Sequence, residues 1–226
     1  MAKDFKLSCV LFDLDGTLAD TAPDLIAALN QAIKLRGFTE VPPETIKPYI
    51  SYGAARMLKK SMNGALNDTQ LDELLEQMLS YYQTHLAEQT RLFQGMQTLL
   101  DELEAKGLKW GVITNKRERF TLPLMTALDL AERAACIVSG DTTANSKPHP
   151  EPMLAACIQA SVPANECLYV GDSAHDIEAG KRANMKTLAA VYGYLKPDDK
   201  PGKWGADALI NSPADISNWI AKHTCF

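Results

Sequence analysis

The segment Cys9-Val-Leu-Phe-Asp13-Leu-Asp15-Gly16-Thr17-Leu18 decides the fold of this 226-residue chain. Its first four residues form a continuous apolar run, which predicts a β-strand buried on both faces. Two carboxylates and a glycine follow directly, where such a strand has to end. Because ligands of open parallel α/β sheets bind at the carboxyl ends of the strands, we expect a functional site at Asp13 and Asp15.

Further apolar runs predict strands of the same sheet. They lie at residues 110–113, 136–138, 168–170 and 188–191, with a weaker run at 208–210. Helical patterns occur between and after them, at residues 96–106, 117–128, 150–160, 177–183 and 212–221. This alternation of strand and helix predicts an α/β fold with a doubly wound, Rossmann-like parallel sheet.

The region from residue 20 to residue 91 carries only helical signals. One helix begins with the capping-box-like Thr21-Ala-Pro-Asp24, a second spans residues 53–62, and a third is capped by Asn67-Asp68 and reaches about residue 88. We therefore predict a small all-helical cap domain (20–91) inserted after the first strand of a catalytic core (1–19 and 92–226).

Composition excludes several classes of partner. The net charge of −5 and the pI of 5.4 argue against nucleic acid, because a phosphate backbone requires a basic surface. No run approaches the roughly 18 apolar residues of a membrane helix, so we expect no membrane partner. The five cysteines are odd in number and lack Cys-x-x-Cys spacing, which indicates reduced thiols in a cytoplasmic protein. The oligomeric state is not predictable from these features.

The pair Asp13 and Asp15 suits catalysis, because the Gly16 turn directs the two carboxylates differently. One can then attack a substrate while the other transfers protons. The alternative is a calcium-binding loop, which requires a later glutamate ligand within a helix–loop–helix unit. A strand precedes the motif here and no such glutamate follows.

Three later motifs lie directly after predicted strands or at the starts of predicted helices. Thr114-Asn115-Lys116 suits phosphate oxygens, although simple helix capping explains it equally well. Lys147 precedes a helix that opens with proline, and on its own it would be a solvated surface charge. Asp172 and Asp176 lie four residues apart across a turn and form a hard oxygen site suited to Mg²⁺; the alternative is two acids at a helix N-terminus.

Together these motifs resemble the haloacid dehalogenase superfamily of phosphatases. The resemblance covers nearly the whole chain, with Asp-x-Asp-Gly-Thr, Thr-Asn, lysine and Gly-Asp-Ser-x-x-Asp in the order of that family. It implies a Mg²⁺-dependent phosphomonoester hydrolase that works through an aspartyl-phosphate intermediate. The helical insert resembles the small cap of that family.

The resemblance also implies roles for individual residues. Asp13 would be the nucleophile and Asp15 the general acid and base, with Thr17 orienting Asp15 or its loop. The phosphate-binding residues would be Thr114, Asn115 and Lys147. The metal site would comprise Asp13, Asp15 through its backbone carbonyl, Asp172 and Asp176.

Charge counting supports the metal. Four carboxylates against Lys147 leave a net charge of −3, which would repel a phosphate dianion. Mg²⁺ would reduce this to −1, and a proton on Asp15 would bring it to zero. We therefore expect substrate binding to require both the metal and a protonated Asp15.

The cap is expected to select the substrate. Gly53 precedes a predicted helix and Arg56 lies in its first turn, where the planar guanidinium suits a carboxylate. The chain is most similar to the phosphoglycolate phosphatase group, and Arg91-Leu-Phe-Gln-Gly-Met and the segment from Tyr192 to Asp207 resemble the subgroup that acts on N-acetylmuramic acid 6-phosphate. Both substrates are small carboxylate-bearing phosphate esters.

Other functions share part of this pattern. A haloacid dehalogenase would use Asp13 without needing an acid at position 15. A phosphomutase of the same superfamily would share all four motifs but release an isomerised sugar phosphate. A non-catalytic, receiver-like module would be phosphorylated on an aspartate and would need neither Asp15 nor a cap.

Overall fold

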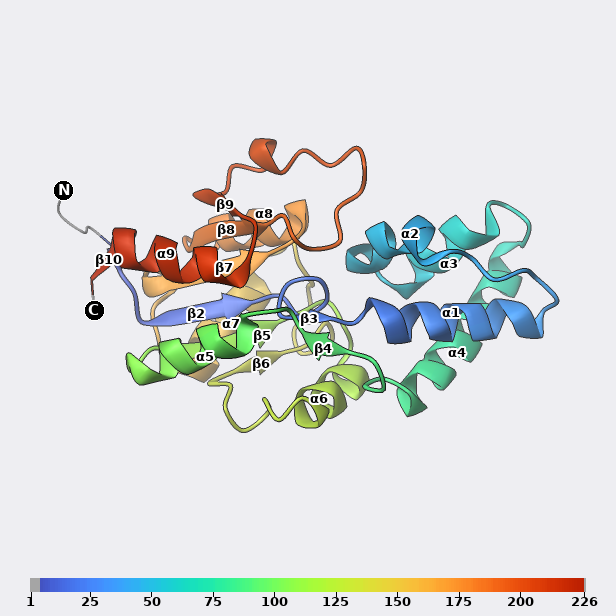
Figure 1. The fold of residues 1–226 in the computed structure, drawn as a ribbon, viewed down its shortest axis with the longest axis horizontal. Helices are drawn as coiled ribbons and strands as arrows, with labels where there is room; N and C mark the ends of the chain where they lie inside the picture. The colour runs from blue at the N-terminus through green and yellow to red at the C-terminus, as the bar shows by residue number, and fades with distance from the viewer. Residues whose placement is uncertain (1–4, 226) are drawn as a thin grey trace.

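The computed structural model describes residues 5–225, and a parallel sheet forms its centre (Figure 1). In spatial order the strands are β6 (Ile137–Val138), β5 (Lys109–Ile113), β2 (Cys9–Phe12), β7 (Cys167–Gly171), β8 (Lys186–Ala190) and β9 (Ala208–Ile210). The chain therefore starts in the middle of the sheet, builds to one edge, and then crosses to the other side. This confirms the predicted doubly wound α/β fold and places the reversal of strand order between β2 and β7, where such folds bind ligands.

Strand β2, formed by the first apolar run, lies in the middle of the sheet. Its four side chains are fully buried, and it pairs in parallel with β5 on one side and β7 on the other. Val10 and Phe12 belong to one core cluster, whereas Cys9 and Leu11 belong to the other. Because successive side chains of a strand face opposite sides, both faces of the sheet must be covered.

Helices supply that cover in two layers. One face packs against α5 (Met96–Ala105), α6 (Glu118–Ala127) and α9 (Pro213–His223), and the other against α7 (Glu151–Ala160) and α8 (Ala174–Arg182). Helix α8 begins three residues before its predicted start because Ser173 caps it through a capping box with Asp176. Within residues 5–225 no helix combines the length and the apolar character needed to cross a membrane.

A helical segment stands beside the sheet in Figure 1. It comprises α1 (Ala22–Leu35), α2 (Pro43–Ile46), the 3₁₀-helix η1 (Lys47–Tyr52), α3 (Ala54–Met62) and α4 (Asp68–Thr84). Helix α1 packs against α4, and the predicted Asn67 cap of α4 is confirmed by a capping box with Gln70. Helix α4 ends four residues earlier than predicted.

Two short strands connect this segment to the rest of the chain. Strand β3 (Ala19–Asp20) pairs antiparallel with β4 (Arg91–Leu92), so the chain leaves and returns at one place. The predicted capping box at Thr21 is wrong, because Thr21 makes no side-chain cap bond. The buried carboxylate of Asp24 instead accepts hydrogen bonds from the backbone N–H (2.8 Å) and the hydroxyl (2.7 Å) of Thr90. These bonds hold the segment that enters the helical region against the segment that leaves it.

Candidate active site

Asp13 lies at the point where the strand order reverses. Its backbone N–H donates to the carbonyl of Val170 at 2.9 Å, which extends the β2–β7 pairing by one residue beyond the strand. The side chain is buried, and its Oδ1 accepts a hydrogen bond from Lys147 Nζ at 2.8 Å. The sheet thus presents Asp13 at the carboxyl edge, as predicted for a ligand-binding residue.

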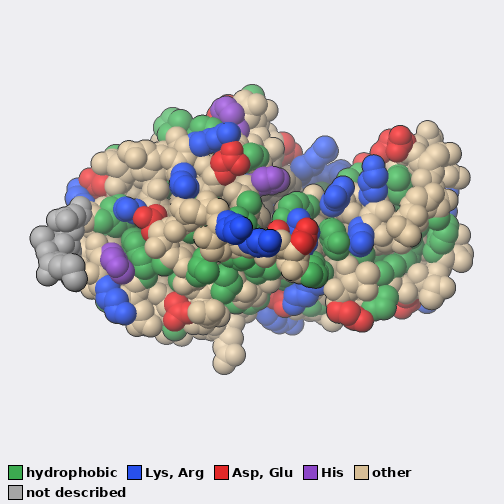
Figure 2. All heavy atoms as spheres, turned by 90° about the horizontal axis from the view of Figure 1, so that it is seen from above, with side chains coloured by type: hydrophobic (Ala, Val, Ile, Leu, Met, Phe, Trp, Pro, Cys, Tyr) green, Lys and Arg blue, Asp and Glu red, His purple; other side chains and the backbone are tan. Residues whose placement is uncertain are grey.

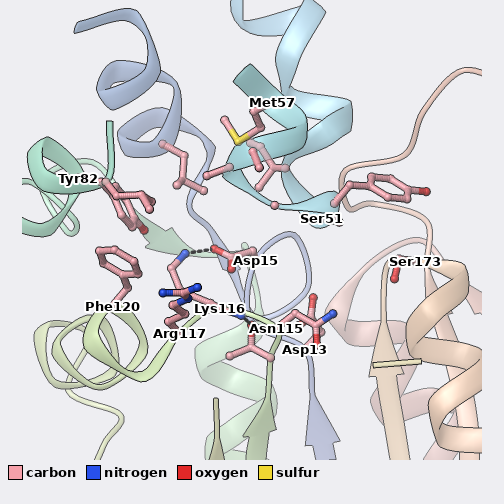
Figure 3. A pocket seen from close by; sticks show the side chains of 18 of the residues that line it. Asp13, Asp15, Ser51, Met57, Tyr82, Asn115, Lys116, Arg117, Phe120 and Ser173 are labelled. Atoms are coloured by element: carbon pink, nitrogen blue, oxygen red, sulfur yellow. Dashed lines mark hydrogen bonds and ion pairs between the residues drawn. The ribbon is translucent and has the colours of Figure 1, made fainter. Parts of the chain in front are cut away.

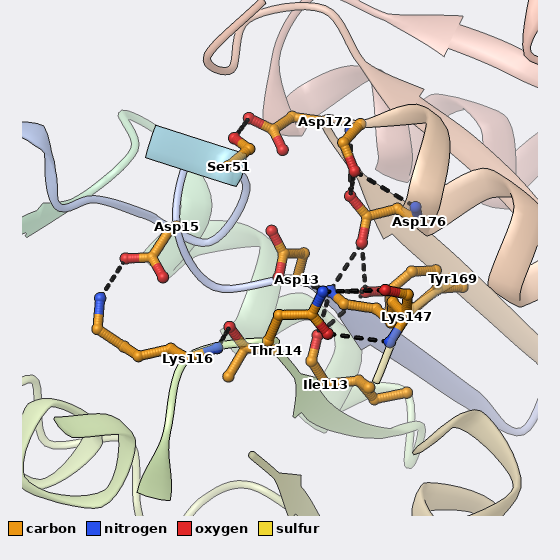
Figure 4. Close-up of polar contacts among 12 residues, drawn as sticks. Asp13, Asp15, Ser51, Ile113, Thr114, Lys116, Lys147, Tyr169, Asp172 and Asp176 are labelled. Atoms are coloured by element: carbon orange, nitrogen blue, oxygen red, sulfur yellow. Dashed lines mark hydrogen bonds and ion pairs between the residues drawn. The ribbon is translucent and has the colours of Figure 1, made fainter. Parts of the chain in front are cut away.

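Lys147 is a buried cation at the centre of the site (Figure 4). Its ammonium contacts Asp13, Asp176 Oδ1 (2.7 Å), the Tyr169 hydroxyl (2.9 Å) and the carbonyl of Ile113 (2.9 Å). Burial alone would lower the pKa of Lys147, but Asp13 and Asp176 more than offset this and raise it. The alternative of a solvated surface lysine is therefore wrong.

Three buried carboxylates surround one point. Asp13, Asp172 and Asp176 each offer an oxygen that lies within 4.8 Å of the others. Burial raises the pKa of Asp13 to about 7; Lys147 opposes this shift, and the charge of Asp176 adds to it. Burial and the charges of Asp13 and Asp176 also raise the pKa of Asp172. These carboxylates repel one another, and a divalent cation would relieve that repulsion.

Asp172 retains one oxygen that a cation could bind. Its Oδ2 accepts hydrogen bonds from the Tyr194 backbone (2.8 Å) and from the Ser51 hydroxyl (2.9 Å). Its Oδ1 is buried and has no hydrogen-bond partner among residues 5–225. A buried, unpartnered carboxylate oxygen beside two further carboxylates fits a hard oxygen-binding cation such as Mg²⁺.

Asp176 is held more fully by the protein. Its Oδ1 accepts from Lys147 and from Tyr169 (3.0 Å), and its Oδ2 accepts from the hydroxyl (2.5 Å) and the N–H (3.1 Å) of Ser173. Gly171 makes this packing possible, since a Cβ there would lie 2.3 Å from the Cβ of Asp176. The carboxylate of Asp176 is thus oriented by four donors.

Asp15 points away from this cluster. Gly16 has a φ of +89°, and a Cβ on it would lie 2.3 Å from Asp172 Oδ2, so the turn requires glycine. Asp15 Oδ1 accepts hydrogen bonds from the Thr21 hydroxyl (2.6 Å) and from Lys116 Nζ (2.5 Å). Thr21, and not the predicted Thr17, contacts Asp15. Sequence reasoning included Lys116 in the motif with Thr114 and Asn115 but gave its side chain no role.

The side chains of the Thr-Asn motif line the cavity and also bond to nearby backbone groups. Thr114 Oγ1 accepts from the backbone N–H of Lys116 at 3.1 Å, and its hydroxyl hydrogen remains available for a ligand. The amide of Asn115 accepts from Lys147 N–H (3.0 Å) and donates to Lys147 C=O (3.1 Å). Its side chain therefore fixes the loop that carries Lys147.

A cavity of about 440 Å³ lies between these groups and the helical segment (Figure 3). Gly53 lines it, whereas Arg56 is exposed and is not part of the lining. Arg117 and His175, to which sequence reasoning gave no role, also line it. In the view of Figure 2, Lys and Arg side chains gather where the helical segment meets the rest of the molecule.

Comparisons with known proteins show what the chain is similar to as a whole. The family model described as haloacid dehalogenase-like hydrolase matches residues 10–190. N-acetylmuramic acid 6-phosphate phosphatase from Pseudomonas aeruginosa is 39% identical over 99% of both chains. Phosphoglycolate phosphatase from Xanthomonas campestris is 38% identical over 92% of this chain and 93% of its own. A crystal structure of a predicted phosphoglycolate phosphatase from Haemophilus somnus is 27% identical, with a TM-score of 0.84 over 95% of this chain and 97% of that one.

Proposed function

Because this chain belongs to the haloacid dehalogenase-like hydrolase family and is a phosphoric monoester hydrolase, we propose that it transfers the phosphoryl group of its substrate to Asp13, with Mg²⁺ as cofactor. The observation that carries this proposal is the contact of buried Lys147 with Asp13, beside a carboxylate cluster that has an unpartnered oxygen. The same contact holds the nucleophile in one orientation and places positive charge where the phosphoryl oxygens must lie.

In the first step an oxygen of Asp13 attacks phosphorus. A bond forms between that oxygen and phosphorus, and the bond to the ester oxygen of the substrate breaks. The leaving oxygen takes a proton from Asp15, which lines the same cavity. Lys147 and the hydroxyl of Thr114 donate to the phosphoryl oxygens, while Asn115 keeps the Lys147 loop in place.

In the second step water hydrolyses the acyl phosphate. Asp15 removes a proton from the water as it attacks phosphorus, so inorganic phosphate leaves and Asp13 is regenerated. When bound, Mg²⁺ would supply positive charge beside the transferring phosphoryl group. We propose that Asp13, Asp172 and the backbone carbonyl of Asp15 hold the ion, and that the fully donor-bound Asp176 supports it through water.

The proposed substrate is a small carboxylate-bearing phosphate ester. N-acetylmuramic acid 6-phosphate and 2-phosphoglycolate both meet this description, and relatives of both names cover nearly the whole chain. We further propose that residues 20–91 act as a cap over a core formed by 1–19 and 92–226, and that the enzyme works in the cytoplasm.

Two measurements test the proposal. Inorganic phosphate release from each ester gives the ratio of kcat/KM, and a phosphomutase would instead yield an isomerised sugar phosphate. Borohydride reduction during turnover should convert the acyl phosphate to homoserine at position 13, which peptide mass spectrometry detects. Phosphate release without homoserine at position 13, under conditions that reduce a control acyl phosphate, would contradict the covalent mechanism.

A further inference from the structure

Three fixed cations line the cavity, and one of them lacks a side-chain partner among residues 5–225. Lys147 is paired with Asp13 and Asp176, and Lys116 is paired with Asp15. The guanidinium of Arg117 has no carboxylate within 4.0 Å and no side-chain hydrogen bond among residues 5–225. Since Lys116 and Lys147 already contact carboxylates at the phosphoryl site, Arg117 is the cavity cation among residues 5–225 that is free to bind a second anionic group of the ligand.

Tyr82 provides a second free polar group at the same end of the cavity (Figure 3). It comes from α4 of the helical segment, is 1% exposed, and its hydroxyl has no hydrogen-bond partner among the described residues. Its ring packs against Phe120 with 5.5 Å between centroids, and Lys116 Nζ lies 5.0 Å from the ring centre. Burial raises the pKa of Tyr82, so the hydroxyl keeps its proton and can donate it.

We propose that Arg117 and Tyr82 form the subsite for the leaving group, in which Arg117 binds a carboxylate and Tyr82 donates a hydrogen bond. This rests on the proposed phosphatase function. Arg117 follows the Thr114-Asn115-Lys116 turn, is the N-cap residue of α6, and lines the same cavity as Asp13 and Asp15. A planar guanidinium binds a carboxylate through two parallel hydrogen bonds, which gives this position specificity as well as charge.

The other residues that line the cavity near Arg117 and Tyr82 indicate a sugar-sized leaving group. Apolar side chains from both parts of the chain line it, and a single carboxylate, Glu76, lies among them. The apolar residues are Leu25, Ile50, Met57, Leu75, Leu79 and Phe120. A cavity of about 440 Å³ lies in the range of sites for drug-sized ligands, and a two-carbon leaving group would leave most of it empty. A carboxylated sugar with an acyl group offers the charge, the hydroxyl groups and the apolar surface that these residues match.

A matched pair of substrates tests the subsite. N-acetylmuramic acid 6-phosphate and N-acetylglucosamine 6-phosphate share the sugar, the acetamido group and the phosphate, and only the first carries a carboxylate. We expect Arg117→Gln to raise KM for the first substrate about 10- to 100-fold, the range for loss of a hydrogen bond to a charged group, and to leave KM for the second within about twofold. Arg117→Lys should restore part of the affinity, because it keeps the charge and loses the fork.

Two further variants complete the test. Tyr82→Phe removes only the hydroxyl and should raise KM for N-acetylmuramic acid 6-phosphate at least threefold (about one neutral hydrogen bond) while kcat is retained. Arg119→Gln is the matched control, since Arg119 lies on the same helix, is exposed, and is not part of the cavity lining. Thermal melting confirms that each variant is folded.

The outcomes separate the subsite from the proposed function. If Arg117→Gln changes both substrates equally, or changes neither, the carboxylate assignment is overturned while the phosphatase proposal stands. An unchanged KM in Tyr82→Phe overturns the role of that hydroxyl. If the wild-type enzyme releases phosphate from neither sugar ester but does so from 2-phosphoglycolate, the sugar-sized subsite is overturned alone. No phosphate release from any of the three esters overturns the proposed function and the subsite with it.

Discussion

Asp13→Asn should stabilise the metal-free protein at neutral pH even though it removes the nucleophile. In the folded state burial raises the pKa of Asp13 to about 7 against the attraction of Lys147, whereas the unfolded value is near 3.8. Between these two values the native state holds a proton that the unfolded state has lost. The contribution of Asp13 to the free energy of unfolding therefore falls as the pH rises from about 4 to about 7, and this contribution changes no further above that window.

The size of the effect follows from the two pKa values. Each unit corresponds to about 1.36 kcal/mol, so the ionisation of Asp13 costs the metal-free native state roughly 4 kcal/mol above pH 7. Asparagine carries no charge, and its side-chain oxygen can still accept the hydrogen bond from Lys147. We therefore expect the variant to gain up to about 4 kcal/mol at about pH 7.5 and almost nothing at about pH 4.

Urea unfolding in excess chelator, at both pH values, measures this difference. Asp72→Asn serves as the control, because Asp72 is exposed and lies on α4 outside the active-site cavity. Saturating Mg²⁺ should stabilise the wild type and reverse the ranking of wild type and variant. A gain of equal size at both pH values would refute the electrostatic reasoning, and turnover within tenfold of wild type would refute Asp13 as the nucleophile.

Three more changes test neighbouring features. Excess chelator should abolish phosphate release, and Mg²⁺ should restore it; undiminished turnover in chelator would exclude the metal. Lys147→Met should lower the free energy of unfolding by about 3–5 kcal/mol in urea titrations, because it leaves buried carboxylates without their cation. The control Lys106→Met, at an exposed position, should change the free energy of unfolding by less than about 0.5 kcal/mol. Ser51→Ala removes the hydrogen bond from the helical segment to Asp172 and should lower kcat/KM about 3- to 10-fold in a phosphate-release assay, whereas Ser61→Ala, whose hydroxyl bonds within α3, should have no effect.

The sheet was predictable from sequence because its strands are short apolar runs buried on both faces. All the predicted strands are present, with ends that differ by at most two residues. The link between sheet and helical segment was not predictable. Strands β3 and β4 contain two residues each, which is too short for any periodicity, and their pairing joins positions about 70 residues apart.

The same distinction between local and long-range features applies to the site. Residues that follow strands were found, because the strand itself fixes where they lie. The partners of those residues were not found, since a contact such as Lys116 to Asp15 joins side chains that are 101 positions apart. Asn115 shows the same limit, because its motif suggested a phosphate donor but gave no sign that its amide also bonds to the Lys147 backbone.

The newly found contacts change the charge balance of the site. Counting from the sequence set four carboxylates against Lys147 alone, which left −3 and required a proton on Asp15 in addition to the metal. In the structure Lys116 pairs with Asp15, and Arg117 and Glu76 line the same cavity, so three cations face five carboxylates and the net charge is −2. A divalent ion would make it zero without any proton on Asp15. An acidic protein can therefore bind a phosphate dianion here, because its positive charges are gathered by the turn that follows β5 and by the buried Lys147.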